Sequence, residues 1–223
     1  VYNFTVDQAT DSNILNDYKI IVHKLNLSGL PTLAKVNKTT GGKWFTSEKK
    51  DYEYFTSRVV EAQTAKQKQF ASIMRMKAMM EYPTKEQYAK GIIKNIGEKC
   101  IIFANTQKQA DRMCKHSYHS KNNESEENLE LFRDGRIDKL SCVLQLSEGV
   151  TIPGLKQGII MHAYGNERKT AQRIGRLLRL NPNETAICHI LCYENTVDEK
   201  WVDSALSSFD STKISRYNPL KSQ

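Results

Sequence analysis

The sequence predicts an α/β protein in which a parallel sheet is covered by helices on both faces, with a helical insert near the N-terminus. Short apolar runs of strand type alternate with helical stretches after residue 97, a pattern typical of parallel sheets. Residues 47–96 are instead rich in Ala, Gln, Lys, Met and Glu, which favours helices. No internal repeat or low-complexity tract is visible.

The N-terminal part divides into a strand, a loop and a helical segment. The run Tyr18–Leu25 predicts a strand because apolar and β-branched residues dominate it. Residues 28–50, rich in Gly, Thr, Asn and Lys, predict an exposed loop or hairpin. Further on, Pro83 should end one helix, and Thr84 with Gln87 resembles a capping box that opens the next.

The C-terminal part alternates regularly between strand and helix patterns. Strands are predicted at 100–104, 140–144, 157–163 and 185–193, and helices at 107–114, 124–134, 167–180 and 197–209. We therefore expect three regions: 1–27, a connection and first strand; 28–96, the loop and helical insert; and 97–223, the α/β domain.

Composition excludes several classes of protein. The chain has 223 residues, 39% hydrophobic and 26% charged, which does not fit a disordered or collagen-like chain. No apolar run approaches the roughly 20 residues that span a bilayer, and no secretory signal is visible. Five scattered Cys predict a reducing compartment. The net charge of +8 is compatible with a polyanionic partner but is not specific for one.

The segment 165–179 carries the strongest chemical signal. On a helix, Gln172, Arg176 and Arg179 fall on one stripe, since each residue turns the chain by about 100°. The opposite side carries Ile174, Leu177 and Leu178. A solvated basic face is the usual explanation of such a row. Two facts favour a phosphate site instead: the cations are Arg, whose planar fork fits phosphate oxygens, and the segment follows an apolar strand directly.

The same segment resembles a known motif. Gln172–Arg179 is similar to the sixth motif of superfamily-two helicases, in the form found in DNA-repair and bacteriophage recombination-type helicases rather than DEAD-box proteins. Lys99–Thr106 resembles the fourth motif, Ser117–Ser120 the next conserved segment, and Ser147–Pro153 the fifth. The resemblance covers about residues 97–205 and, more loosely, residues 15–20.

The resemblance implies a RecA-like second motor domain. Arg176 and Arg179 would be arginine fingers that reach the γ-phosphate of ATP, with Gln172 assisting. Gly149 would allow backbone N–H groups to approach a phosphate, and Thr151, where many relatives carry Asp, would contact the nucleotide. The implied contacts to nucleic acid are Asn105, Thr106, His119, Ser120, Ser147 and Glu148.

The sequence has no P-loop. The one Gly-Lys pair, Gly42-Lys43, is followed by Trp44 and lacks the first glycine of the motif, and no DExx box follows a predicted strand. We therefore expect ATP and Mg²⁺ to be bound mainly by a first motor domain, in cis or in trans, and the chain alone not to hydrolyse ATP. The start at Val1 favours a piece of a longer helicase over a separate subunit.

The leading hypothesis is the second motor domain of an ATP-dependent helicase or translocase of nucleic acid, with DNA favoured, in the cytoplasm of a bacterial or phage-infected cell. The alternative is a non-catalytic nucleic-acid-binding or adaptor module that retains the motor fold. Neither hypothesis involves a membrane or a metal site in this chain. Cys188 and Cys192 lack the spacing of a zinc site and should be buried thiols.

The insert leaves two explanations open. Its Lys and Arg residues alternate with aromatic residues such as Trp44, Tyr54 and Phe55, which suits base stacking and phosphate contact. A solvated helical face around a small core of its own explains the same pattern equally well.

Overall fold

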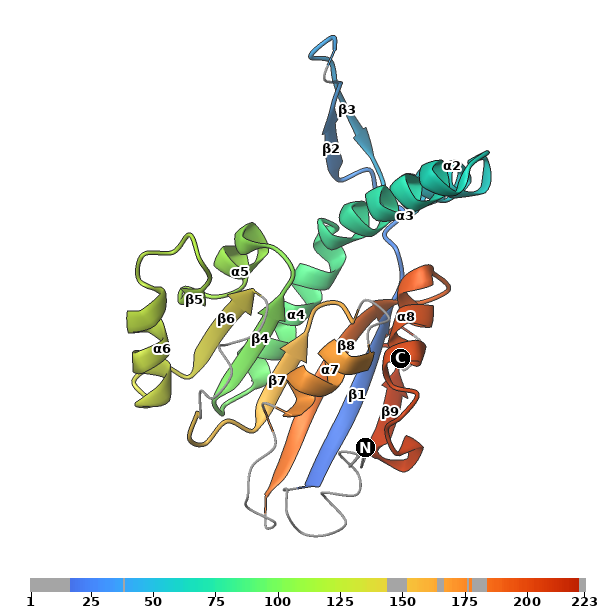
Figure 1. Cartoon of the computed structure of the whole chain (residues 1–223). Coiled ribbons are helices and arrows are strands. Elements are labelled where there is room, and N and C mark those ends of the chain that lie inside the picture. The colour runs from blue at the N-terminus through green and yellow to red at the C-terminus, as the bar shows by residue number, and fades with distance from the viewer. Residues whose placement is uncertain are drawn as a thin grey trace. The chain divides into compact units, whose positions relative to one another are not determined.

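The computed structural model describes residues 17–37, 39–143, 152–163, 167–175, 177 and 184–220 (Figure 1). It divides into two compact units. Unit 1 comprises residues 1–25 and 85–223, and unit 2 comprises residues 26–84. The helix that begins at Pro83 therefore groups almost entirely with unit 1, whereas the sequence pattern places it in the insert.

Unit 1 is built on a seven-stranded sheet in the order β5-β6-β4-β7-β8-β1-β9. Every pairing in this sheet is parallel, which confirms the predicted fold class. The strands are β1 (Asp17–Leu25), β4 (Cys100–Ala104), β5 (Ser117–Tyr118), β6 (Lys139–Val143), β7 (Gln157–Ile160), β8 (Thr185–Tyr193) and β9 (Ile214–Tyr217). β5 and β9 were not predicted, because two and four residues are too few to show a strand pattern.

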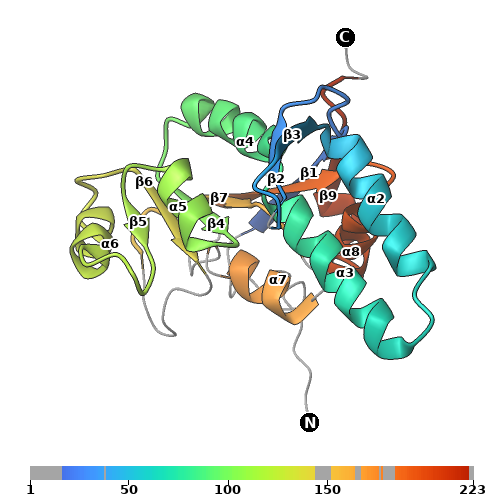
Figure 2. The same cartoon turned by 90° about the horizontal axis from the view of Figure 1, so that it is seen from above.

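Helices cover both faces of this sheet (Figure 2). They are α4 (Pro83–Asn95), α5 (Gln107–Met113), α6 (Ser125–Arg133), α7 (Glu167–Gly175) and α8 (Val197–Ala205). Alternate residues of the central strand β4 pack into different cores, which shows the two layers. Ile101 and Phe103 pack with residues of α6, α7 and α8. Cys100 and Ile102 pack with residues of α4 and α5.

Unit 2 consists of a hairpin followed by two helices. The hairpin joins β2 (Leu33–Val36) and β3 (Lys43–Thr46) in antiparallel register, which confirms the hairpin alternative for residues 28–50. Its connection contains Gly41 at φ +70°, a conformation that suits glycine. The helices are α2 (Glu48–Val60) and α3 (Ala65–Met80).

The capping box that the sequence suggested at Thr84 is wrong. α4 already begins at Pro83, and Thr84 donates both its backbone N–H and its hydroxyl to the carboxylate of Glu48, each at 2.8 Å. Glu48 is fully buried and also accepts the N–H of Ser28 at 2.9 Å. The capping box lies at the start of α3, between Thr64 and Gln67.

A buried ion pair joins α4 to α8 within unit 1. The Lys85 ammonium and the Asp198 carboxylate are fully buried, with Nζ and Oδ2 2.5 Å apart. Lys85 Nζ also donates to the carbonyl of Met161 at 3.1 Å and lies 2.9 Å from Nδ1 of His162. Burial opposes ionisation of Asp198, but the charge of Lys85 and the His162 ring outweigh it and hold the pKa of Asp198 at about 2. The ionised pair therefore fixes both helices to the segment that follows β7.

A second buried polar contact joins β1 to β8. Nε2 of His23 lies 2.9 Å from Nδ1 of His189, and Nδ1 of His23 lies 3.0 Å from the hydroxyl of Tyr88 on α4. Burial lowers the pKa of each histidine to about 4. The neighbouring His189 ring further disfavours a charge on His23. Both rings are therefore neutral at pH 7.

We expect Lys85→Met to lower the free energy of unfolding by about 3–5 kcal/mol, because Asp198 would stay buried without its counter-charge. Urea denaturation measures this loss. The matched control is Arg133→Ala, which removes an exposed pair with Glu130 and should cost less than about 1 kcal/mol. A loss for Lys85→Met as small as that of the control would contradict the importance of the buried pair.

We also expect unit 1 to lose stability as the pH falls from about 6.5 to 4. Folding lowers the pKa of His23, His162 and His189 from 6.5 to about 4, so in this window the unfolded chain binds more protons than the folded one. The urea midpoint measured from pH 7.5 to 4.5 should fall, and His23→Gln should flatten the decline. Asp198 titrates below this window, so it does not account for such a fall. A midpoint independent of pH would refute the neutral histidine pair.

Candidate functional site

The candidate site lies at one edge of the large sheet. Because all its strands are parallel, the segments that follow β4, β5, β6 and β7 start at the same edge. The chain runs from β4 to β5 and β6 on one side and then to β7 and β8 on the other. In open α/β sheets, ligands bind at the carboxyl edge where the connections diverge in this way. All site residues predicted from the sequence follow one of these four strands.

Asn105 and Thr106 come directly after the central strand β4. The Thr106 hydroxyl caps α5 by accepting the N–H of Gln109 at 3.1 Å. The backbone N–H of Asn105 donates to Oε1 of Gln109 at 2.9 Å. Both polar atoms of the Asn105 side chain are buried and have no hydrogen-bond partner within the described part of the chain. Since buried amides almost always have a partner, this side chain is suited to bind a ligand at the edge.

His119 and Ser120 follow β5, and the structure gives them different roles. The His119 ring is 8% exposed. Its Nδ1 accepts the N–H of Lys121 at 3.3 Å, and its Nε2 therefore donates to Asp111 at 2.8 Å. Hydrogen bonding from His119 in turn lowers the pKa of Asp111. His119 thus anchors its loop, while the neighbouring Ser120 is exposed.

Gln107, which directly follows the fourth-motif segment, and the Ser120 loop line one groove. The Nε2 of Gln107, two residues after Asn105, donates to the hydroxyl of Ser120 at 3.1 Å. The groove is lined mainly by amide, hydroxyl and aromatic groups, from Gln107, Tyr118, His119, Ser120, Asn122, Asn123, Ser125, Glu126 and Val143. Such neutral donors and acceptors suit contacts to the oxygen atoms of phosphates and sugars.

α7 is fixed to the sheet by its apolar residues and by one arginine. Ile174 and Leu177 are fully buried, as the helical spacing predicts. Arg173 is 6% exposed and donates from one of its terminal guanidinium nitrogens to the carbonyl of His162 at 3.0 Å. Its guanidinium also lies 5.6 Å from the centre of the Phe103 ring on β4. Arg173 therefore holds α7 in place and is not available as a solvent-facing finger.

Close packing between β7 and Leu177 also holds the α7 region against the sheet. A Cβ atom at Gly158 would lie 2.8 Å from a methyl carbon of Leu177, so glycine lets the segment after α7 approach the strand. At Gly175, in contrast, an added Cβ would have no heavy atom within 4 Å. No close packing among the described residues therefore requires glycine at position 175.

The other predicted residues divide into two groups. Gln172 lies on α7 and is half-buried. Six predicted residues lie outside the described ranges: Arg176, Arg179, Ser147, Glu148, Gly149 and Thr151.

Sequence reasoning did not identify the buried polar residues that support the edge. Lys85, His162 and Asp198 form one cluster through the contacts of Lys85. Lys85 gave no signal because a lysine in a helical, charged stretch is normally exposed. Asp198 gave no signal either, because an acidic residue in the first turn of a helix is expected from the helix dipole alone.

Two further observations concern metals and membranes. Among the described residues, no group of three or more His, Cys, Asp or Glu side chains could hold a metal ion. Cys188 and Cys192 are buried, and burial raises the pKa of each thiol to about 12. Within the same described ranges, no helix combines the length and apolar character needed to cross a membrane.

Comparison with known proteins bears on the same region. Residues 84–181 match the family model of the helicase conserved C-terminal domain. A curated relative, the DNA 3'-5' translocase XPB2 of Sulfurisphaera tokodaii, is 33% identical over 100 residues, which cover 42% of this chain. The match spans only 23% of the relative's length.

Solved structures share the fold. The C-terminal domain of the DEAD-box protein Dbp5 has a TM-score of 0.51 at 18% identity, covering 60% of this chain and 83% of that chain. The S. cerevisiae Dbp5 C-terminal domain bound to Gle1 and IP6 has a TM-score of 0.50 at 17% identity, with the same coverage. The sheet of unit 1 is accordingly RecA-like. Residues 84–181 of this chain are therefore similar to the helicase conserved C-terminal domain.

Proposed function

We propose that this chain provides the second motor domain of an ATP-dependent helicase or translocase, and that the full enzyme moves along DNA. The proposal is supported by Asn105, Thr106, His119 and Ser120, which follow β4 and β5 at the same edge of the sheet. Beside them, Gln107 donates to Ser120 in a polar groove. The matched relative is a DNA translocase by name, which favours DNA over RNA.

On this proposal, the described edge residues contact the nucleic-acid backbone. The Asn105 amide nitrogen can donate to a phosphate oxygen. Because both polar atoms of this side chain are buried without a partner among the described residues, such a bond would satisfy a group that is costly to leave unpaired. Thr106, whose hydroxyl caps α5, and the exposed Ser120 are proposed to add hydroxyl contacts at the same edge. His119 takes part by fixing the Ser120 loop through Asp111. Ser147 and Glu148 remain predicted contacts from the segment after β6.

The proposed arginine fingers, Arg176 and Arg179, follow the last residue of α7 in the sequence. The buried contacts of Arg173 and Ile174 fix one side of this helix against the sheet. From their three-and-four residue spacing in the sequence, we propose that Gln172, Arg176 and Arg179 lie on the other side. ATP with Mg²⁺, held by a P-loop domain, would supply the γ-phosphate that these guanidinium groups stabilise; Gly149 and Thr151 are proposed to lie beside the nucleotide.

Replacing Arg176 by Ala in the complete two-domain protein should lower nucleic-acid-stimulated ATP hydrolysis by about 10³-fold or more, because arginine fingers contribute on that scale in other NTPases. Arg136→Ala is the matched control, since Arg136 is exposed and pairs only weakly with Asp134 at the surface. A rate for Arg176→Ala within about twofold of the parent would contradict the finger role and favour the non-catalytic module.

Gly175→Ala tests the close approach of another domain to the same helix. The added Cβ would meet no heavy atom within 4 Å among the described residues, so the fold should tolerate it. Reduced ATP hydrolysis together with undiminished stability is the expected result. Unchanged hydrolysis would show that nothing approaches the backbone at this point.

A further inference from the structure

Unit 2 contains most of the excess positive charge of the chain. Residues 26–84 hold ten Lys and Arg but five Asp and Glu, so they account for +5 of the total +8. Two of the acids, Glu48 and Asp51, are buried. Asp51 is also bonded internally, to Lys35 at 2.9 Å and to the Tyr82 hydroxyl at 3.0 Å. The outer surface is therefore more basic than the composition suggests.

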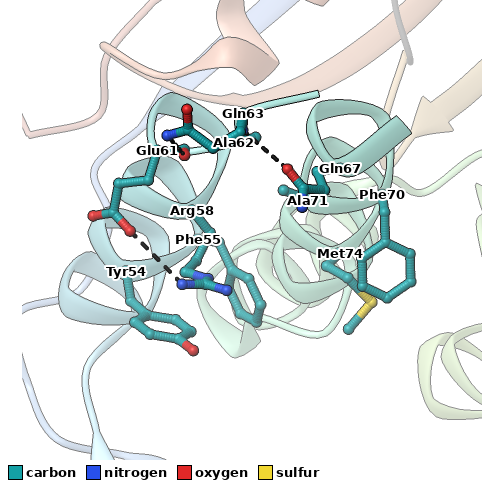
Figure 3. A pocket seen from close by; sticks show the side chains of 10 residues that line it. All are labelled: Tyr54, Phe55, Arg58, Glu61, Ala62, Gln63, Gln67, Phe70, Ala71 and Met74. Atoms are coloured by element: carbon teal, nitrogen blue, oxygen red, sulfur yellow. Dashed lines mark hydrogen bonds and ion pairs between the residues drawn. The ribbon is translucent and has the colours of Figure 1, made fainter. Parts of the chain in front are cut away.

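A groove between α2 and α3 exposes aromatic rings on this basic unit (Figure 3). Tyr54 on α2 and Phe70 on α3 are 59% and 66% exposed. Phe55 lies beside Tyr54, with ring centres 5.3 Å apart, and Met74 continues the apolar lining. Such large exposed rings bury little surface within unit 2, so folding alone does not explain them.

Cations accompany the rings at helical spacing. Lys50, Tyr54 and Arg58 succeed one another every four residues, so they form a single stripe along α2. On α3, Lys66 precedes Phe70 by four residues. Lys50, Arg58 and Lys66 are all exposed. The one acidic residue of the groove, Glu61, lies 3.7 Å from Arg58 with both side chains 61% exposed, a pairing of little energy that leaves the guanidinium accessible.

We propose that the α2–α3 groove is a binding site for single-stranded nucleic acid. Bases would stack on Tyr54 and Phe70, while phosphates would contact Lys50, Arg58 and Lys66. Alternating rings and cations match the two components of such a strand, its aromatic bases and its anionic backbone. An acidic peptide would satisfy the cations but leave the rings without partners. The inference rests on the proposed function for its ligand class, and the groove lies outside residues 84–181, which match the helicase family.

Binding by the 223-residue chain, without ATP, tests the groove by fluorescence anisotropy. The probes are a labelled oligo-dT, an oligo-rU, an abasic DNA strand of equal length and a duplex. Tyr54→Ala and Phe70→Ala should each weaken binding of dT or rU about tenfold, since one stacked base is worth roughly that factor, and should leave abasic binding unchanged. Phe70→Tyr should retain the parent affinity. The matched control is Val60→Ala, whose side chain is 79% exposed and lies outside the groove.

Arg58→Ala tests the phosphate contact separately. It should weaken binding of the abasic strand as well, and should reduce the slope of log affinity against log salt by about 0.7. The dT and rU arms distinguish a DNA strand from an RNA strand. Ring variants that bind dT and rU as tightly as the parent, or a parent that binds the abasic strand or the duplex as tightly as dT and rU, would overturn the proposal. Such a failure would leave the Arg176 test unaffected, because that test measures ATP hydrolysis.

Discussion

Parallel pairing throughout the large sheet determines where this domain can do chemistry. Each strand must be followed by a connection that returns across a face of the sheet, so all strands end at one edge and helices occupy both faces. β4 is buried at every position and lies inside the sheet, between β6 and β7. The polar residues that follow its last apolar residue are therefore the first groups on the strand that a ligand can reach.

Buried polar contacts set the position of α7 as much as apolar packing does. Lys85 contacts the carbonyl of Met161 and the ring of His162, and the carbonyl of His162 in turn accepts a hydrogen bond from Arg173. A purely apolar interface tolerates small shifts, whereas a bonded ammonium and guanidinium have fixed partners and directions. The segment from β7 to α7 is thereby held in one register, at the expense of desolvating two charges within the core.

Apart from the short strands β5 and β9, the strands and helices of unit 1 could be predicted because their signals are local. Apolar runs such as Cys100–Ala104 and the spacing of Ile174 and Leu177 depend only on neighbours in the sequence. The roles of His119 and Arg173 could not be predicted in this way. Whether an imidazole or a guanidinium faces solvent or a buried partner depends on Asp111 and Phe103, which the fold brings near. The same applies to Thr84, whose hydroxyl bonds Glu48 instead of capping its helix.

One carboxylate determines how unit 2 is inserted into the chain. Glu48 accepts the backbone N–H of Ser28, near the beginning of the unit, and that of Thr84, at its end. The chain therefore leaves and returns at nearly the same point, whatever lies between. An inserted segment whose two ends lie side by side can be lengthened, shortened or exchanged without stretching the flanking backbone. Glu48 thus joins the two ends of the unit, so that the length of chain between Ser28 and Thr84 is not dictated by the strands of the sheet.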